Sequence, residues 1–258
     1  MNSNTIFCFT GTGNSLKAAK DISMQLPDCD IQSMAPKRHV FIKQDAQWIG
    51  FVFPVYYLGI PLQVQDFLSS LDFQNSKPYI FAISTCAKFH GNSLRQVNVL
   101  LEKKGLKLSY GNFVYMGDNA VTLYNAKGSN PKIERNYKIQ IESIIPDIRV
   151  KRIQTIKREI DIVSHYHNLR IKNVNVKDTG YQISDDCISC GVCEKVCPSK
   201  NIEIKSGKPC FNHQCQQCMA CIQLCPKSAI NYMSKTQTRG RYHNQFITTQ
   251  EIINLWKC

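Results

Sequence analysis

The chain has 258 residues, of which 43% are hydrophobic, and a formal net charge of +13. This length suits one large or two modest globular domains. The longest apolar-looking stretch, 49–62, is interrupted by Pro54, Gly59 and Pro61, which excludes a membrane span there. The N-terminus lacks the basic region of a secretory signal, so we expect a protein of the reducing cytoplasm.

Strands and helices are expected to alternate along residues 1–145. Strands are predicted at 4–9, 48–53, 79–84 and 106–116, with a second strand near 29–34. The intervening patterns predict helices at 14–26, 62–71, 92–104 and 131–145. This alternation predicts an α/β fold, with a parallel sheet covered by helices on both faces. The stretch between the second and third strands is too short for a full crossover helix.

The loop between the first strand and the first helix predicts a phosphate site. It consists of Thr10, Gly11, Thr12, Gly13, Asn14 and Ser15. A loop that opens a helix presents backbone N–H groups and the positive helix end to an anion, and three hydroxyls add donors. A dinucleotide fingerprint requires glycine where Leu16 stands, and a P-loop requires lysine where Asn14 stands. Asp28 and Asp30, however, lie near the position of a Rossmann acid.

These loop residues resemble the FMN-phosphate loop of flavodoxins position by position. Two later segments resemble the loops that flank the flavin, and each follows a predicted strand. The resemblance implies FMN as cofactor and a doubly wound sheet of order 2-1-3-4-5. It implies flavin contacts from the first loop and from Pro54, Val55, Tyr56, Tyr57, Thr85, Cys86, Ala87 and Gly91. One of the two tyrosines is expected to stack on the flavin ring.

Residues 146–175 are expected to form a basic, helical connector that begins at Pro146. Its charge is densest between Arg149 and Arg158. A solvated helix face is the favoured interpretation, and a docking patch for an acidic redox partner is the functional alternative. No nucleic-acid partner is expected, because the chain carries no aromatic-interleaved basic motif.

Two copies of one cysteine run, C-x2-C-x2-C-x3-C-P, follow the connector. This run binds two 4Fe–4S clusters in bacterial-type ferredoxins, and the fourth cysteine of each copy ligates the cluster of the other copy. One cluster is therefore expected to bind Cys187, Cys190, Cys193 and Cys225. The second cluster is expected to bind Cys215, Cys218, Cys221 and Cys197. The alternatives are zinc and disulfides. Structural zinc usually joins two separated cysteine pairs, and a disulfide framework suits a short secreted chain. The doubled run fits neither pattern, so iron–sulfur clusters are the favoured interpretation.

Nearly the whole chain resembles the flavodoxin–ferredoxin fusion proteins of anaerobic prokaryotes, the EFR-type ferredoxins. The resemblance includes the tail 240–243 and a final helix near 248–257. It implies a flavodoxin-like FMN domain at 1–145 and a smaller α+β ferredoxin-like domain at 176–258 that ends in a helical tail. The expected function is electron transfer between the clusters, FMN and a redox partner protein. The alternatives are a flavin-dependent reductase of a small substrate and a zinc-bound regulatory module.

Overall fold

A five-stranded parallel sheet forms the centre of the larger part of the molecule. The computed structural model describes residues 4–34, 40–74, 76–126, 128–157 and 161–257. The strands are β1 (Asn4–Cys8), β2 (Cys29–Ser33), β4 (Trp48–Pro54), β6 (Tyr79–Cys86) and β7 (Tyr110–Tyr115). Their order across the sheet is β2-β1-β4-β6-β7, and every neighbouring pair is parallel. This is the doubly wound flavodoxin-like order, which confirms the predicted fold class.

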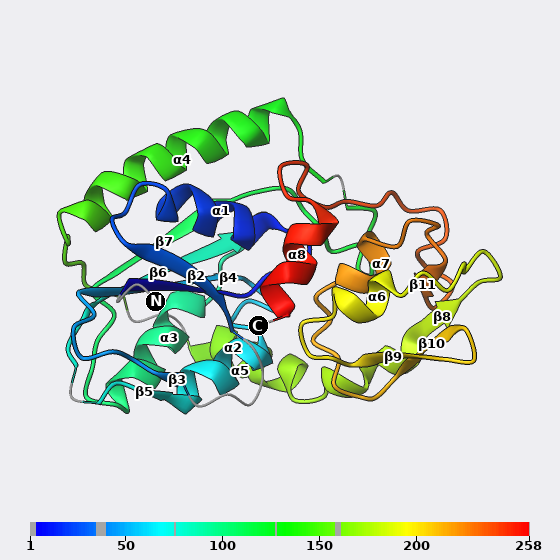
Figure 1. The fold of residues 1–258 in the computed structure, drawn as a ribbon, viewed down its shortest axis with the longest axis horizontal. Coiled ribbons are helices and arrows are strands. Elements are labelled where there is room, and N and C mark those ends of the chain that lie inside the picture. Colours follow the sequence, from blue (N-terminus) through cyan, green and yellow to red (C-terminus); the bar gives the residue numbers. More distant parts are fainter. Residues whose placement is uncertain (1–3, 35–39, 75, 127, 158–160, 258) are drawn as a thin grey trace.

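Helices cover both faces of this sheet (Figure 1). One face carries α1 (Asn14–Ser23) and α4 (Pro131–Arg149), and the other carries α2 (Leu62–Ser70) and α3 (Ser93–Glu102). Because both faces are covered, the central strands are continuous apolar runs rather than alternating ones. In β4 every residue from Trp48 to Phe53 is buried. A short parallel pair, β3 (Val40–Phe41) with β5 (Leu71–Asp72), lies beside the main sheet, and residues 40–47 contain no helix.

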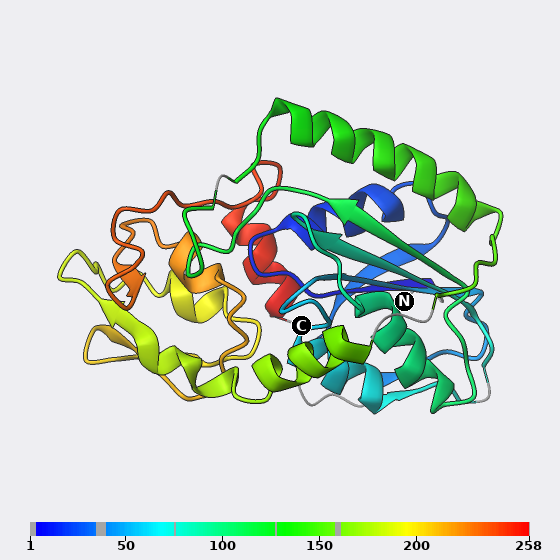
Figure 2. The same ribbon diagram turned by 180° about the vertical axis from the view of Figure 1, so that it is seen from behind.

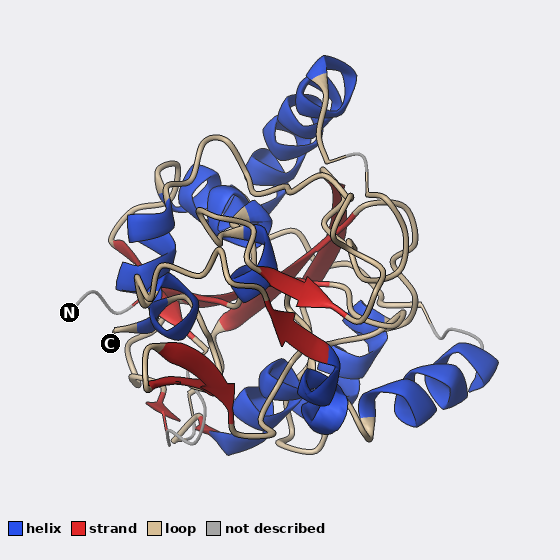
Figure 3. Ribbon diagram, turned by 90° about the vertical axis from the view of Figure 1, so that its right-hand side faces the viewer, coloured by secondary structure: helices blue, strands red, loops and turns tan. Residues whose placement is uncertain are grey.

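The smaller part contains the cysteine runs and two short antiparallel sheets. One sheet pairs β8 (Tyr181–Ile183) with β11 (Ile230–Tyr232), and the other pairs β9 (Ile202–Lys205) with β10 (Lys208–Phe211). The one-turn helices are α6 (Val192–Lys195) and α7 (Ala220–Gln223). Figure 3 shows these short pairs on the side turned toward the viewer. Their small core includes several of the run cysteines themselves.

The connector is partly helical. Helix α4 continues through Pro146 to Arg149, and the chain then forms α5 (Asp161–Ile171) and the 3-10 helix η1 (Asn175–Gly180). Figure 2 shows this segment running from beneath the sheet to the smaller part. No helix of the described residues is long and apolar enough to cross a membrane.

The C-terminal segment returns to the larger part. Its last helix, α8 (Thr249–Trp256), begins with a capping box in which Thr248 and Glu251 satisfy each other's backbone N–H groups. The buried side chains of α8, including Ile252 and Trp256, belong to the core of the parallel sheet rather than to the core of the cysteine-rich part. The chain therefore crosses between the two parts twice.

Candidate functional site

Each of two cavities is bordered by four of the run cysteines. The outer cavity is lined by Cys187, Cys190, Cys193 and Cys225, and the inner cavity by Cys197, Cys215, Cys218 and Cys221. They enclose about 370 and 300 Å³ of space free of protein atoms, part of it open to solvent. Each cavity thus combines three cysteines of one run with the fourth cysteine of the other.

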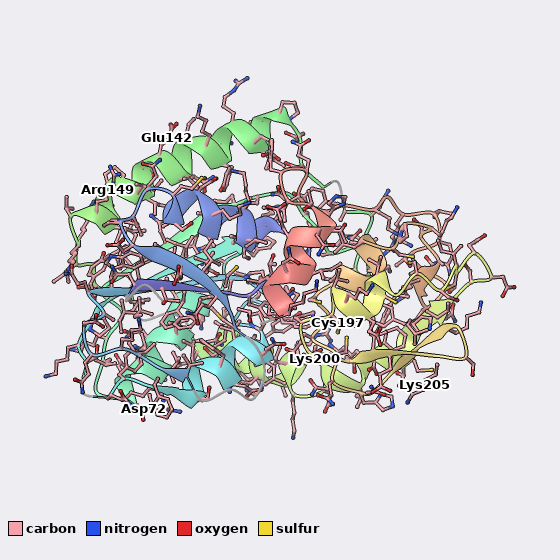
Figure 4. The ribbon with its side chains drawn as sticks, in the orientation of Figure 1. Asp72, Glu142, Arg149, Cys197, Lys200 and Lys205 are labelled. Atoms are coloured by element: carbon pink, nitrogen blue, oxygen red, sulfur yellow. The ribbon has the colours of Figure 1, made fainter. Side chains whose placement is uncertain are left out.

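The two cavities differ in exposure. All four inner cysteines are buried, whereas Cys190 of the outer cavity is exposed and Cys187 is half-buried. Figure 4 shows Cys197 at the border between the two parts of the molecule. The inner cavity therefore faces the larger part, and the outer cavity lies nearer to solvent.

The two cysteine loops repeat the same backbone conformation. The residues on either side of the middle cysteine have positive φ in both loops: Ser189 and Gly191 in the first, Gln217 and Met219 in the second. Successive turns of opposite hand direct backbone N–H groups into the concave side of a loop, which favours a bound anion. Three of these four residues carry side chains, so the conformation is imposed on residues that disfavour it.

Backbone N–H groups donate to several of the cysteine sulfurs. Asn201 N donates to Cys197 Sγ at 3.3 Å, and Ala229 N donates to Cys225 Sγ at 3.3 Å. In each case the donor lies four residues after the fourth cysteine of its run. Such bonds stabilise a thiolate more than a thiol, because the acceptor is then charged.

Burial opposes thiolate formation in the absence of a positive charge. Desolvation raises the pKa of Cys215 to about 12 and that of Cys193 to about 11, and it raises the pKa of Cys218 and Cys221 further. Metal cations reverse this balance, since a coordinating thiol is deprotonated outright. Eight clustered thiols, seven of them buried or half-buried and several accepting from N–H donors, therefore fit a metal cluster better than free cysteines. No group of three or more His, Cys, Asp or Glu side chains within the described ranges could hold a single metal ion.

A large cleft opens at the carboxyl ends of β1, β4 and β6, where ligands bind in open α/β sheets. It contains about 2210 Å³ of space free of protein atoms, including open solvent. Most of the predicted flavin residues line it: Thr10, Gly11, Thr12, Asn14, Ser15, Pro54, Val55, Tyr56, Tyr57, Thr85, Cys86 and Ala87. Two do not: Gly13 is the left-handed N-cap of α1, and Gly91 packs against the carbonyl group of Leu58.

The hydroxyls of the first loop are buried and already hydrogen-bonded. Thr10 Oγ1 accepts from Gly13 N at 3.1 Å, Thr12 Oγ1 accepts from Asn119 Nδ2 at 2.8 Å, and Ser15 Oγ pairs with Thr85 Oγ1 at 2.8 Å. Thr10 and Thr12 act as acceptors, so their O–H groups stay able to donate. The first bond within α1 runs from Lys17 N to Gly13 O, which leaves the N–H groups of the first turn for an anion.

Two tyrosines of the second loop lie between the cleft and the inner cavity. Tyr56 Oη is buried without a hydrogen-bond partner. Its pKa is raised by burial first and then by the nearby charges of Cys218 and Cys215. Tyr57 Oη donates to Gln217 Oε1 and accepts from Lys177 Nζ at 3.0 Å, and the same ammonium lies 4.2 Å from the ring centroid. The aromatic side of the cleft therefore lies beside the inner cysteine loop, and Met219 lines both sites.

One wall of the cleft was not predicted from the sequence. This wall comprises the loop after β7, Tyr166 of the connector, and Gln217 and Met219 beside the inner cysteines. The loop after β7 could have been predicted, because it follows the end of a parallel strand, as the cleft loops after β1, β4 and β6 do. Nothing in the local sequence marks the contributions of the connector or of the cysteine loop.

Two residues at and after the end of β6 have ordinary roles. His90 stacks on Phe113, with ring centroids 4.0 Å apart, and does not line the cleft. Cys86 lines the cleft, but burial raises its pKa to about 12, so it remains a thiol.

The cleft and the inner cavity share a boundary of close backbone contacts. A Cβ atom on Gly11 would collide with the carbonyl oxygen of Cys218. Gln217 and Met219, the neighbours of Cys218, both line the cleft. Gln223 Nε2 also donates to Asn119 O at 2.8 Å. The first loop and the inner cysteine loop are therefore packed directly against each other.

Comparisons with known proteins bear on each part. Residues 119–245 match a family model described as a 4Fe-4S dicluster domain, which shows an iron–sulfur domain in this part of the chain. No curated protein sequence matches the chain.

Several solved structures of flavoproteins are similar to the larger part. Oxidised flavodoxin 1 from Bacillus cereus is 14% identical over 55% of this chain and 95% of its own, with a TM-score of 0.37. An FMN-dependent NADH-azoreductase from Bacillus anthracis, in complex with FMN, is 11% identical over 57% of this chain and 99% of its own, with a TM-score of 0.39. At these scores the strand order remains the basis of the fold assignment.

Proposed function

We propose that this chain, whose doubly wound sheet and 4Fe–4S dicluster domain fit a flavodoxin–ferredoxin fusion, passes electrons between two 4Fe–4S clusters and FMN. The observation that carries the proposal is the contact between Gly11 and Cys218. It brings the phosphate loop of the cleft against the loop of the inner cysteines. Electron transfer within one chain requires such neighbouring sites.

The residues divide into three groups under this proposal. Cys187, Cys190, Cys193 and Cys225 hold the outer cluster, and Cys197, Cys215, Cys218 and Cys221 hold the inner one. The Thr10–Ser15 loop holds the phosphate of FMN, and the loops after β4 and β6 hold its ring. Each cluster carries single electrons, whereas FMN takes one or two, so the set links one-electron and two-electron partners.

The difference in exposure supports an order for the electron path. Cys190 and Ile188 at the outer cavity are exposed, so a redox partner protein reaches this site most directly. The path then leads to the inner cavity and the cleft. We place the domain boundaries at 1–145, 146–175 and 176–258, with α8 returning to the first domain's core. Reducing cytoplasm is the compartment that keeps ligand thiols available.

A second candidate function is reduction of a small substrate at the cleft. Phe89, Leu123 and Tyr124 line the cleft. The first two are more than half exposed, and Tyr124 is half exposed. Exposed apolar side chains at a cleft are typical of small-molecule sites. Turnover of a soluble acceptor, with saturation at low substrate concentration, would favour this function over that of an electron carrier.

Substitution of a single fourth cysteine tests the crossed ligation. Cys197→Ala should damage the cluster held by Cys215, Cys218 and Cys221 and leave the other cluster intact, whereas Cys225→Ala should do the reverse. Iron and sulfide analysis of the anaerobic wild type should give about eight of each per chain, and EPR of the variants identifies the lost cluster. Loss of the cluster within the same run would contradict the assignment, and a colourless protein with stoichiometric zinc would remove the proposed function.

A further inference from the structure

Arg241 has an incomplete set of partners in the tail that leads from the cysteine-rich part to α8. Its Nη2 donates to Ile230 O at 3.2 Å and to Asn231 Oδ1 at 2.8 Å. Its Nε and Nη1 are fully buried and have no hydrogen-bond partner. Buried donors without acceptors are rare in folded proteins and call for a specific explanation.

The charge of this guanidinium is also unbalanced. Of the carboxylates in the described parts of the chain, none forms an ion pair with Arg241. A buried charge is normally paired, because desolvation is otherwise too costly. Burial lowers the pKa of Arg241, and the nearby Cys225 sulfur raises it. The negative group that raises this pKa therefore belongs to the outer cavity.

Arg241 does not line that cavity itself but is anchored to a residue that does. Ile230, whose carbonyl accepts from Nη2, lines the outer cavity together with Cys225. The preceding residue, Ala229, donates its N–H to Cys225 Sγ. On the other side, Tyr242 N donates to Gln223 Oε1 at 2.8 Å, which holds the tail in place.

We propose that Arg241 is the counter-charge of the outer cluster, held beside the cavity by its bond to Ile230 O. The inference rests on the cluster assignment of the proposed function. Reduction adds one negative charge to a cluster, and a fixed positive charge nearby stabilises that form. Arg241 therefore raises the reduction potential of the outer cluster.

The test is an EPR-monitored redox titration of the anaerobic holoprotein. Arg241→Met removes the charge and the donors while keeping a chain of similar length. We expect the ratio of oxidised to reduced outer cluster to rise about tenfold or more at a given potential. For a one-electron couple, each tenfold corresponds to a reduction potential lower by about 59 mV. Arg241→Lys keeps the charge and loses the planar fork, so its shift should be smaller. Cys225→Ser identifies which EPR signal belongs to the outer cluster.

Arg239→Met is the matched control. Arg239 carries the same charge two residues earlier in the same tail, but its Nη1 donates to Val121 O, which is not part of the outer cavity. The control should leave the potential of the outer cluster nearly unchanged. An equal shift in Arg239→Met and Arg241→Met would mean that net charge alone sets the potential, and would overturn the proposal.

A second measurement needs no substitution of Arg241. Wild-type protein labelled with ¹⁵N in arginine alone should show a ¹⁵N coupling to the reduced outer cluster by pulsed EPR. Absence of that coupling overturns the inference even if Arg241→Met fails to assemble. Complete clusters with an unmoved potential in Arg241→Met would refute the role of Arg241 only, whereas a wild type that lacks about eight iron per chain would refute the proposed function itself.

Discussion

At Gly11 the backbone of the first loop lies so close to the inner cysteine loop that no side chain fits between them. The obstacle to a Cβ atom is the carbonyl group of Cys218, which is backbone and not a flexible side chain. The close approach explains why glycine, rather than another small residue, occupies this position.

Gly11→Ala should therefore disturb both cofactor sites at once. Forcing an extra carbon into a packed contact costs about 1–3 kcal/mol of stability, so both thermal stability and FMN affinity should fall. Gly240→Ala is the matched control, because its Cβ atom would meet no atom within 4 Å. Unchanged melting temperature and FMN affinity in Gly11→Ala would show that the two loops do not touch in solution.

The hydroxyls of Thr12 and Ser15 allow a separate test of the phosphate site. Replacing both by alanine removes hydrogen bonds to a charged group, each of which contributes about 1.5–3 kcal/mol. FMN affinity should fall about tenfold or more, as measured by titrating the flavin-free protein with FMN.

Riboflavin is the control ligand, since it lacks the phosphate. Thr12 also accepts a hydrogen bond from Asn119, so the double substitution could loosen the loop as a whole. In that event riboflavin affinity would fall as far as FMN affinity. A loss confined to FMN assigns the two hydroxyls to the phosphate, and equal wild-type affinity for both ligands would contradict the site.

Helix α8 shows how an element can belong to a core far from it in sequence. Its apolar face packs at the edge of the sheet beside β2, and Trp256 lies with its ring 5.7 Å from that of Phe9, at a tilt of 63°. Phe9 directly precedes the Thr10–Ser15 loop. The last helix thus packs against the residue before this loop, while its preceding tail contacts the loop itself through the bond from Asn244 N to Thr12 O.

Trp256→Ala should destabilise the flavodoxin-like part by about 3–5 kcal/mol, as is usual for a large buried side chain. Urea unfolding followed by far-UV circular dichroism measures the loss. Lys257→Ala, at the exposed next position, should change stability little. The iron content should stay the same in both variants, and a fall confined to iron would place α8 with the cysteine-rich part instead.

At the scale of the whole molecule, short-range patterns predicted most of the architecture. Apolar runs located the central strands β1, β4 and β6 within a few residues, because strands buried on both faces need continuous apolar sequence. The edge strands β2 and β7, which are less buried, also lie within a few residues of their predicted positions. The cysteine spacing located both runs, because the geometry of the ligands around a cluster constrains their spacing in the sequence. Contacts between distant segments carry no such local pattern. The approach of Met219 to the cleft, the return of α8 and the burial of Arg241 depend on how the two parts pack, and single side chains do not reveal that.

The central claim is that one chain transfers electrons between its clusters and its flavin. The most direct measurement is a one-electron laser-flash reduction of the anaerobic holoprotein, followed by absorbance at the cluster and flavin bands. Because the Cys218 loop packs against the Gly11 loop, we predict that the electron redistributes between cluster and flavin at a first-order rate that is unchanged on dilution. A rate that rises with protein concentration, or no redistribution at all, would contradict the account.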